Sequence, residues 1–164
     1  MEKFLLVKTK DIPELARLAH TIWFEYWGII LEKGQIKYMV DKFQSETAIN
    51  NQIENDNYSY YFINLNNQNA GYFGVSNKKD YLFLSKLYLL KDYRGQGLGH
   101  KAFNKIKEIA KELNHNKIRL TVNKYNTNTI KAYEKWGFKT VDSVVTDIGE
   151  GYVMDDYIME FNLN

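Results

Sequence analysis

The sequence predicts a single domain of the α/β class, in its α+β form, with a mixed sheet of six to seven strands and about four flanking helices. The chain has 164 residues, which is a usual length for one compact domain. Apolar residues make up 45% of it, enough to build one core, and strand and helix patterns follow one another without a linker or an internal repeat. We therefore expect residues 1–164 to form one domain.

The first third of the chain is predicted to be one strand followed by helices. An apolar run predicts a short strand over residues 4–8. Asp11 and Pro13 then mark a helix start, because a carboxylate can cap the first turn and proline fits it without a backbone N–H. Residues 35–43 and 45–53 continue in a helical pattern. The first helix should bury one face, formed by Leu15, Leu18, Ala19, Ile22 and Trp23.

The middle of the chain reads as three strands. Residues 58–64 and 70–76 are aromatic and β-branched, and the Asn-rich stretch LNNQN separates them, as in a β-hairpin. A second polar turn at 77–80 leads into the long apolar run YLFLSKLYLL at 81–90. We expect these three strands to be antiparallel neighbours in the sheet.

The last part of the chain returns to helices. An apolar stripe predicts a helix over 98–113 that packs on the sheet, and 117–123 is the next strand. A second helix over 127–136 ends at Gly137, which we expect in the left-handed conformation that often closes a helix. Two final strands are predicted at 138–145 and 152–161, on either side of the turn DIGEG. This order of elements requires a mixed sheet, mostly antiparallel.

Composition excludes several classes of function. Lys and Arg number 22 against 20 Asp and Glu, and a formal charge of +2 gives no electrostatic reason to expect a nucleic-acid partner. The chain has no cysteine, which rules out disulfides, thiolate metal sites and a cysteine nucleophile. Its three histidines lack ligand spacing, so no metal is expected. The apolar run near the N-terminus is too short for a signal peptide or a membrane span, and we expect a cytoplasmic protein with no membrane partner.

Three glycines and an arginine lie between the long strand and the helix that follows it. Arg94, Gly95, Gly97 and Gly99 stand where backbone N–H groups can converge on an anion, and the helix N-terminus adds a partial positive charge. A pyrophosphate suits such a loop; a simple tight turn is the alternative. The spacing is not that of a nucleotide-binding P-loop, because Gly99 is not followed by Lys and Ser or Thr. The loop also lies outside the first strand–helix unit, where a dinucleotide-binding domain would carry it.

Two motifs resemble the signatures of the GNAT superfamily of N-acetyltransferases. The run RGQGLG matches the R/Q-x-x-G-x-G/A signature and follows an apolar strand directly. Downstream, VNKYNTNTIKAYEKWGF resembles the second signature, with Asn126 seven positions before Tyr133 and with Gly137 and Phe138 closing the helix. The tail DIGEGYVMDDYIMEF is similar to the last hairpin of polyamine and related small-amine members. The resemblance extends from about residue 70 to the end.

The resemblance implies a GNAT-like sheet with a splayed central strand pair and a groove for acetyl-CoA as cosubstrate. Amides around the glycine loop would bind the pyrophosphate together with the Arg94 side chain, and amides of the splayed strand would pair with the pantetheine arm. Asn126 would bond to the pantetheine amide region. The implied coenzyme-binding residues are Leu87, Tyr88, Leu89, Arg94, Gly95, Gln96, Gly97, Leu98, Gly99, His100, Asn126, Tyr133 and Lys135.

The same resemblance implies catalytic groups. The Leu87 N–H would stabilise the oxyanion that forms on the thioester carbonyl, and Tyr133 would protonate the departing thiolate. Polyamine members often carry a glutamate nine positions before the motif arginine, where this sequence has Ser85. A serine cannot act as a base alone, so a water held by Ser85 is one route for deprotonating the amine. The plainer interpretation of Tyr133 is a core aromatic residue.

Other groups could act on the acceptor side. Glu25 and Tyr26 lie late in the first helix beside two tryptophans, where they could form an acidic and aromatic wall for a cation, or simply a packed helix end. Asp155 and its neighbour Asp156 could attract an amine, although paired acids in a hairpin are usually solvated. The sequence does not identify which of these groups is the base.

We therefore expect an acetyl-CoA-dependent N-acetyltransferase in which a primary amine attacks the thioester directly in a ternary complex. Small amines or polyamines, amino acids and peptide N-termini all stay open as acceptors. A GNAT-like module that binds acetyl-CoA without turnover, as a sensor, is the alternative. Family analogy makes a homodimer plausible, with no residue-level evidence for it.

Overall fold

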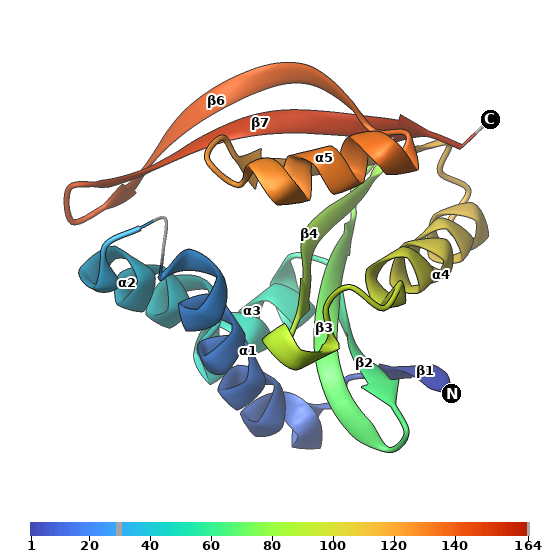
Figure 1. Ribbon diagram of the computed structural model, residues 1–164, viewed down its shortest axis with the longest axis horizontal. Helices are drawn as coiled ribbons and strands as arrows, with labels where there is room; N and C mark the ends of the chain where they lie inside the picture. The colour runs from blue at the N-terminus through green and yellow to red at the C-terminus, as the bar shows by residue number, and fades with distance from the viewer. Residues whose placement is uncertain (29–30, 164) are drawn as a thin grey trace.

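A seven-stranded sheet forms the centre of the protein in the computed structural model, which describes residues 1–28 and 31–163 (Figure 1). The strand order is β1-β2-β3-β4-β5-β7-β6. All neighbouring strands are antiparallel except β4 and β5, which are parallel, so the predicted mixed sheet is confirmed. The strands are β1 (Glu2–Leu6), β2 (Tyr58–Leu65), β3 (Gln68–Asn77), β4 (Leu82–Leu89), β5 (Lys117–Asn123), β6 (Lys139–Gly149) and β7 (Tyr152–Asn162).

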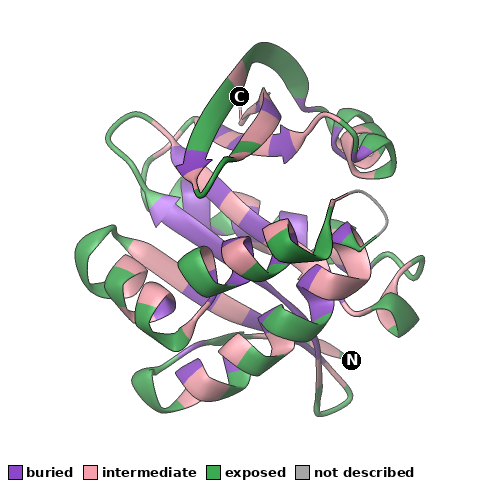
Figure 2. Cartoon of the chain, turned by 90° about the vertical axis from the view of Figure 1, so that its left-hand side faces the viewer, coloured by how far each residue is buried: buried purple, intermediate pink, exposed green. Residues whose placement is uncertain are grey.

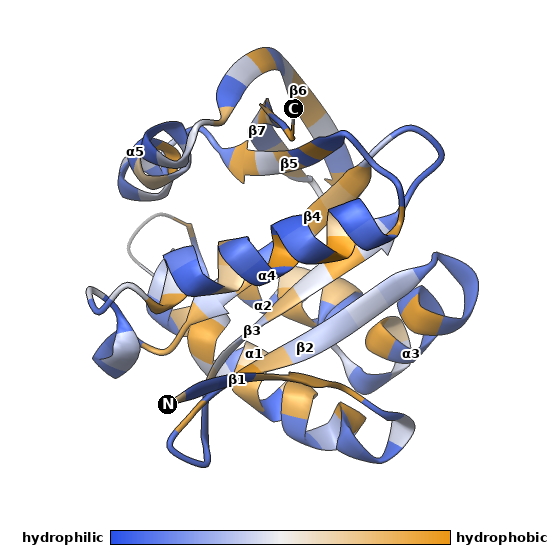
Figure 3. Ribbon diagram, turned by 90° about the vertical axis from the view of Figure 1, so that its right-hand side faces the viewer, coloured by the Kyte–Doolittle hydropathy of each residue, from blue (hydrophilic) through white to orange (hydrophobic). Residues whose placement is uncertain are grey.

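Five α-helices in the described residues cover the two faces of this sheet, and each face has its own buried cluster (Figures 1 and 2). The helices are α1 (Ile12–Trp27), α2 (Lys33–Phe43), α3 (Glu46–Asn55), α4 (Leu98–Glu112) and α5 (Thr127–Trp136). The first three pack on one face, and α4 and α5 contribute to the core on the other. Along α4, orange and blue residues alternate at helical spacing, as expected of a helix with one buried stripe (Figure 3).

Two turns follow from the chemistry of their residues. Asn66 and Asn67 connect β2 to β3 with φ values of 51° and 67°, a conformation that asparagine tolerates better than most residues. Gly137 ends α5 with φ 108°, so the predicted left-handed cap is confirmed. No helix in the described part of the chain has both the length and the apolar composition to cross a membrane.

The start of the chain differs from the prediction. Strand β1 ends at Leu6, two residues before the predicted end, because Thr9–Asp11 form a 3-10 turn, η1. The Asp11 carboxylate accepts a hydrogen bond from the Lys8 N–H at 3.0 Å, so it caps this turn and not the first turn of α1. The Asp11 side chain, which sequence reasoning assigned as the cap of α1, thus caps the 3-10 turn η1 before it.

The hairpin of β6 and β7 reaches across the molecule to α2 (Figure 1). The Tyr38 hydroxyl and the Lys42 ammonium both donate to the Ile148 carbonyl, at 2.5 and 2.6 Å. On the other strand of the hairpin, the Gln35 amide donates to the Val153 carbonyl at 2.9 Å. These bonds fix β7 opposite α2, and a cavity lies between them.

Candidate active site

Strands β4 and β5 are paired at one end only. Their register runs from Leu82 opposite Ile118 to Leu84 opposite Leu120, and beyond it the two strands separate. The separation begins at Ser85, where the pairing of β3 with β4 shifts by one residue, as in a β-bulge. The structure therefore contains the predicted splayed central strand pair.

The opened edge of β4 presents backbone groups to the gap. The Leu90 N–H donates to the Ala70 carbonyl on β3 at 2.8 Å. Because N–H groups alternate in direction along a strand, those of Leu87 and Leu89 point away from β3 toward the gap. Both residues line a groove of about 1220 Å³ that runs from this edge to the glycine loop.

The glycine loop closes the far end of the groove. Gly95 and Gly97 have φ values of 78° and 81°, a region that residues with a Cβ rarely adopt, and α4 begins at Leu98. The first N–H groups of a helix have no partner within it, so they are free to bind an anion. The geometry fits a pyrophosphate, and Gly95, Gly97 and Gly99 all line the groove.

The Arg94 side chain connects the glycine loop to β4 and α1. Its Nε donates to the Leu89 carbonyl at 3.1 Å, and its guanidinium carbon lies 3.9 Å from the centre of the Tyr26 ring. Its Nη2 lies 3.5 Å from a carboxylate oxygen of Glu25, which also accepts from the Lys91 N–H at 3.1 Å. Glu25 and Tyr26 thus lie in this groove beside Arg94, and their acceptor-side role stays a prediction.

The remaining predicted groove residues lie in three kinds of surroundings. His100, Asn126 and Lys135 line the groove. Gln96 donates from its amide nitrogen to the Asp92 carbonyl at 3.2 Å, and the Leu98 side chain is buried in the core; neither residue is among those that line the groove. Tyr88 points its ring into a second cavity, and Tyr133 is not among the residues that line either cavity.

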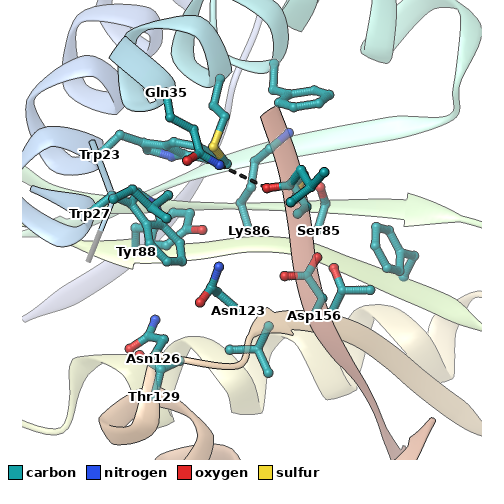
Figure 4. A pocket seen from close by; sticks show the side chains of 18 of the residues that line it. Trp23, Trp27, Gln35, Ser85, Lys86, Tyr88, Asn123, Asn126, Thr129 and Asp156 are labelled. Atoms are coloured by element: carbon teal, nitrogen blue, oxygen red, sulfur yellow. Dashed lines mark hydrogen bonds between the residues drawn. The ribbon is translucent and has the colours of Figure 1, made fainter. Parts of the chain in front are cut away.

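The second cavity lies on the other side of β4, under α1, α2 and the β6–β7 hairpin, with a volume of about 220 Å³ (Figure 4). The bulge at Ser85 shifts the alternation of β4, so Ser85, Lys86 and Tyr88 all line this cavity. Asn126 and Thr129 line both cavities and mark where they meet. Most of the other walls are apolar: Trp23, Trp27, Leu31, Met39, Phe43, Tyr58, Phe83, Val122, Val153 and Met154.

Asp156 is a buried carboxylate in this second cavity. It lies on β7 opposite Asn123 of β5 and is 5% exposed. Burial raises its pKa to about 6, with a further contribution from the negative charge of Asp155. Asp155, on the opposite face of the strand, lies 2.8 Å from the Lys124 ammonium and is outside the cavity lining.

Lys86 is the second charged residue in the cavity wall. Its ammonium donates to the Tyr60 hydroxyl at 2.5 Å and to the Gln52 carbonyl oxygen at 3.4 Å, and it lies 5.0 Å from the centre of the Tyr58 ring. Burial lowers its pKa to about 7, because these partners are all uncharged. Sequence reasoning missed this residue, because the bulge that turns it into the cavity leaves no signal in the continuous run YLFLSKLYLL.

Ser85 and Tyr133 lie in different surroundings. The Tyr58 hydroxyl donates to Ser85 Oγ at 3.0 Å in the second cavity. Tyr133 is 7% exposed and packs on Trp136 and Phe138, in the same core cluster as Leu89. Burial raises the pKa of its hydroxyl, and the neighbouring Tyr26 adds to that effect.

Comparison with known proteins assigns this arrangement to a family. The model of the acetyltransferase (GNAT) family matches residues 17–138. The chain belongs to the GNAT family. It is thus an acetyl-CoA-dependent N-acetyltransferase, as its motifs predicted. A Lactobacillus delbrueckii subsp. lactis protein described as an uncharacterized N-acetyltransferase in the pepI 3′ region is 22% identical over 156 residues, 90% of each chain.

Solved structures of GNAT proteins share the whole fold. PaiA N-acetyltransferase from Thermoplasma acidophilum, solved in complex with coenzyme A, superposes with a TM-score of 0.83 at 20% identity, over 99% of both chains. The ribosomal-protein-S18-alanine N-acetyltransferase from Escherichia coli gives a TM-score of 0.73 at 17% identity, over 100% of this chain and 95% of that one. At these identities the likeness establishes the fold and leaves the acceptor open.

Proposed function

We propose that this GNAT enzyme acetylates a primary amine that binds in the cavity beside Asp156, by direct attack on acetyl-CoA held in the groove. The observation that supports this proposal is the junction of the two cavities. Asn126 and Thr129 line both, at the point where β4 and β5 separate. A thioester lying along the opened edge of β4 would face an amine held by the buried carboxylate.

Coenzyme binding by the groove is the first testable consequence. Calorimetry on the folded protein is expected to detect binding of both coenzyme A and acetyl-CoA. Arg94→Gln should weaken binding about tenfold, or about 1.4 kcal/mol, because it removes the positive charge and the bond to the Leu89 carbonyl that shapes the loop. The exposed Lys139→Gln is the matched control and should bind as the wild type does. Absence of heat from the wild type with either compound would refute the proposal.

In the proposed reaction, Asp156 holds the substrate ammonium and accepts one of its protons, which frees the nitrogen lone pair for attack. A primary ammonium with a pKa near 10 costs roughly 4 kcal/mol to deprotonate at neutral pH. A carboxylate whose pKa is raised to about 6 is mostly ionised at pH 7 and is a better proton acceptor than an ordinary aspartate. Asp156 lines the same cavity as Ser85, the position at which polyamine members often carry a glutamate. A buried carboxylate in this cavity favours catalysis over a sensor without turnover.

Groups on β4 and α5 are proposed to stabilise the oxyanion and the leaving thiolate. Attack forms a bond from the amine nitrogen to the thioester carbon, and negative charge grows on the carbonyl oxygen, toward which the Leu87 N–H is proposed to point. One such donor typically contributes on the order of 3 kcal/mol to lowering the barrier. The carbon–sulfur bond then breaks, and the nitrogen releases its second proton as the amide forms, which neutralises the departing thiolate. Tyr133 is proposed to donate a hydrogen bond to that sulfur; the raised pKa of its buried hydroxyl favours this over a complete proton transfer.

Tyr133→Phe is expected to lower kcat at least about tenfold, because the substitution removes only the donor to the leaving sulfur. The KM for acetyl-CoA should change little. Tyr61→Phe, which removes a hydroxyl from a ring stacked on Phe73 outside both cavities, is the control and should keep the wild-type rate. Steady-state release of free thiol measures both constants. A wild-type kcat in Tyr133→Phe would remove the residue from the mechanism.

The homodimer expected from family analogy stays a prediction.

A further inference from the structure

The acceptor cavity has one negative and one positive group among its described lining residues. Asp156 is the carboxylate and Lys86 is the cation. The other polar lining groups are amides and hydroxyls, and aromatic and aliphatic side chains make up most of the wall (Figure 4). The cavity therefore offers a charged partner to one ammonium group and no carboxylate to a second.

Lys86 also occupies the positions that a second ammonium would use. Its nitrogen already donates to the Tyr60 hydroxyl and to the Gln52 oxygen, and it lies over the Tyr58 ring. Oxygen acceptors and aromatic faces are the neutral groups that stabilise a cation in an apolar site. In Figure 4 the Lys86 side chain points away from Asp156, so the two charges lie toward different parts of the cavity.

A second ammonium is disfavoured in both protonation states of Lys86. A charged Lys86 repels it. When Lys86 is uncharged, the second ammonium still loses its hydration on entering the cavity and finds no carboxylate to pair with. Burying an unpaired charge in this way is costly. An amine with a single charge avoids both costs, since its ammonium pairs with Asp156 and its remaining atoms meet apolar walls.

The size and shape of the wall indicate the body of that amine. Trp23 and Tyr88 pack edge to face, with ring centres 5.7 Å apart, and Trp27 lies beside Trp23 at 6.1 Å. An apolar cavity of roughly 150 Å³ is large enough to bind benzene. The volume here is about 220 Å³, which suits a phenylalkyl or hexyl group.

We propose that the acceptor is a primary amine with one positive charge and an apolar body of this size, and that Lys86 is the residue that excludes amines with a second positive charge. This inference rests on the proposed function of the cavity. It narrows the acceptor class to apolar monoamines and makes polyamines poor substrates.

The experiment is an amine series on the wild-type enzyme. Hexylamine and phenethylamine carry one charge, and hexamethylenediamine has the same chain as hexylamine with a second ammonium at its end. We expect kcat/KM for hexylamine to exceed that for the diamine at least about tenfold. An equal or higher value for the diamine would overturn the inference, whatever the variants do.

Substitutions at Lys86 test its role. Lys86→Met removes the positive charge and should reduce the ratio of hexylamine to diamine activity severalfold. Lys86→Glu supplies a carboxylate for the second ammonium and should invert the ratio. The exposed Lys79→Glu changes the net charge of the protein equally and should keep the wild-type ratio. Thermal melts establish folding; if Lys86→Glu does not fold, Lys86→Met decides. A wild-type ratio in folded Lys86 variants would refute the role of this residue.

Binding separates this inference from the proposed function. Trp23 and Trp27 line the cavity, so quenching of tryptophan emission in the presence of coenzyme A reports amine binding without transfer. Tighter binding of hexylamine than of the diamine, with no acetylation of any amine, would support the inference and refute the proposed function. Acetylation of both amines with equal efficiency would support the proposed function and refute the inference.

Discussion

Asp156→Asn is expected to lower kcat/KM for the amine about a hundredfold or more while leaving coenzyme A affinity near the wild-type value. The substitution keeps the shape of the side chain and removes both the charge proposed to hold the ammonium and the site proposed to accept its proton. General-base assistance contributes typically 10²- to 10⁴-fold. The coenzyme groove does not include Asp156 among its lining residues, so calorimetry with coenzyme A should separate the two effects.

The pH dependence provides a second measure of the same residue. In the wild type, kcat/KM should fall as the pH drops through about 6, because Asp156 becomes protonated there and can no longer accept a proton. This acid limb should disappear in Asp156→Asn. The matched control is Asp155→Asn on the opposite face of β7, which pairs with Lys124 and should keep the limb, shifted slightly downward because a neighbouring negative charge is lost. An unchanged rate and pH profile in Asp156→Asn would exclude it as the base.

The sequence was sufficient to predict the fold because most elements carry local signals. The Asn-rich hairpin between β2 and β3, the apolar stripe of α4 and the glycine at the end of α5 each determine their own backbone. The error at the start of the chain occurred where a side chain had two possible roles. Asp11 could cap either the 3-10 turn or the helix after it, and only the packed structure shows that it serves the turn.

The groove proposed for the coenzyme was predictable for the same reason, whereas the cavity proposed for the acceptor was not. The run from Arg94 to Gly99 is one continuous segment whose glycines and helix start define an anion site locally. The cavity depends on register. Asp155 and Asp156 are adjacent, and only the pairing of Asp156 with Asn123 decides which carboxylate is buried. Lys86 enters the cavity because of a bulge in a strand whose apolar residues show no alternation.

The cost of burying Lys86 should be measurable as stability. Its pKa is lowered from 10.5 to about 7, so between these values the unfolded chain binds more protons than the folded one, and the free energy of unfolding must rise with pH. The full rise is at most about 5 kcal/mol, since one pKa unit corresponds to about 1.4 kcal/mol. Below about pH 7 both states are protonated, and the folded protein bears the whole cost of the buried cation.

Lys86→Met is therefore expected to stabilise the protein at pH 7 by about 2 kcal/mol, the cost of the buried cation less the hydrogen bonds that the variant loses. The gain should shrink toward pH 10 and vanish or reverse there, because the wild-type lysine is then uncharged in the folded state and almost so when unfolded. Urea unfolding across this pH range gives the measurement, with the exposed Lys111→Met as the control that should follow the wild type. A parallel pH dependence in Lys86→Met and the wild type would show that burial does not lower the pKa of Lys86 and that the folded protein bears no such cost.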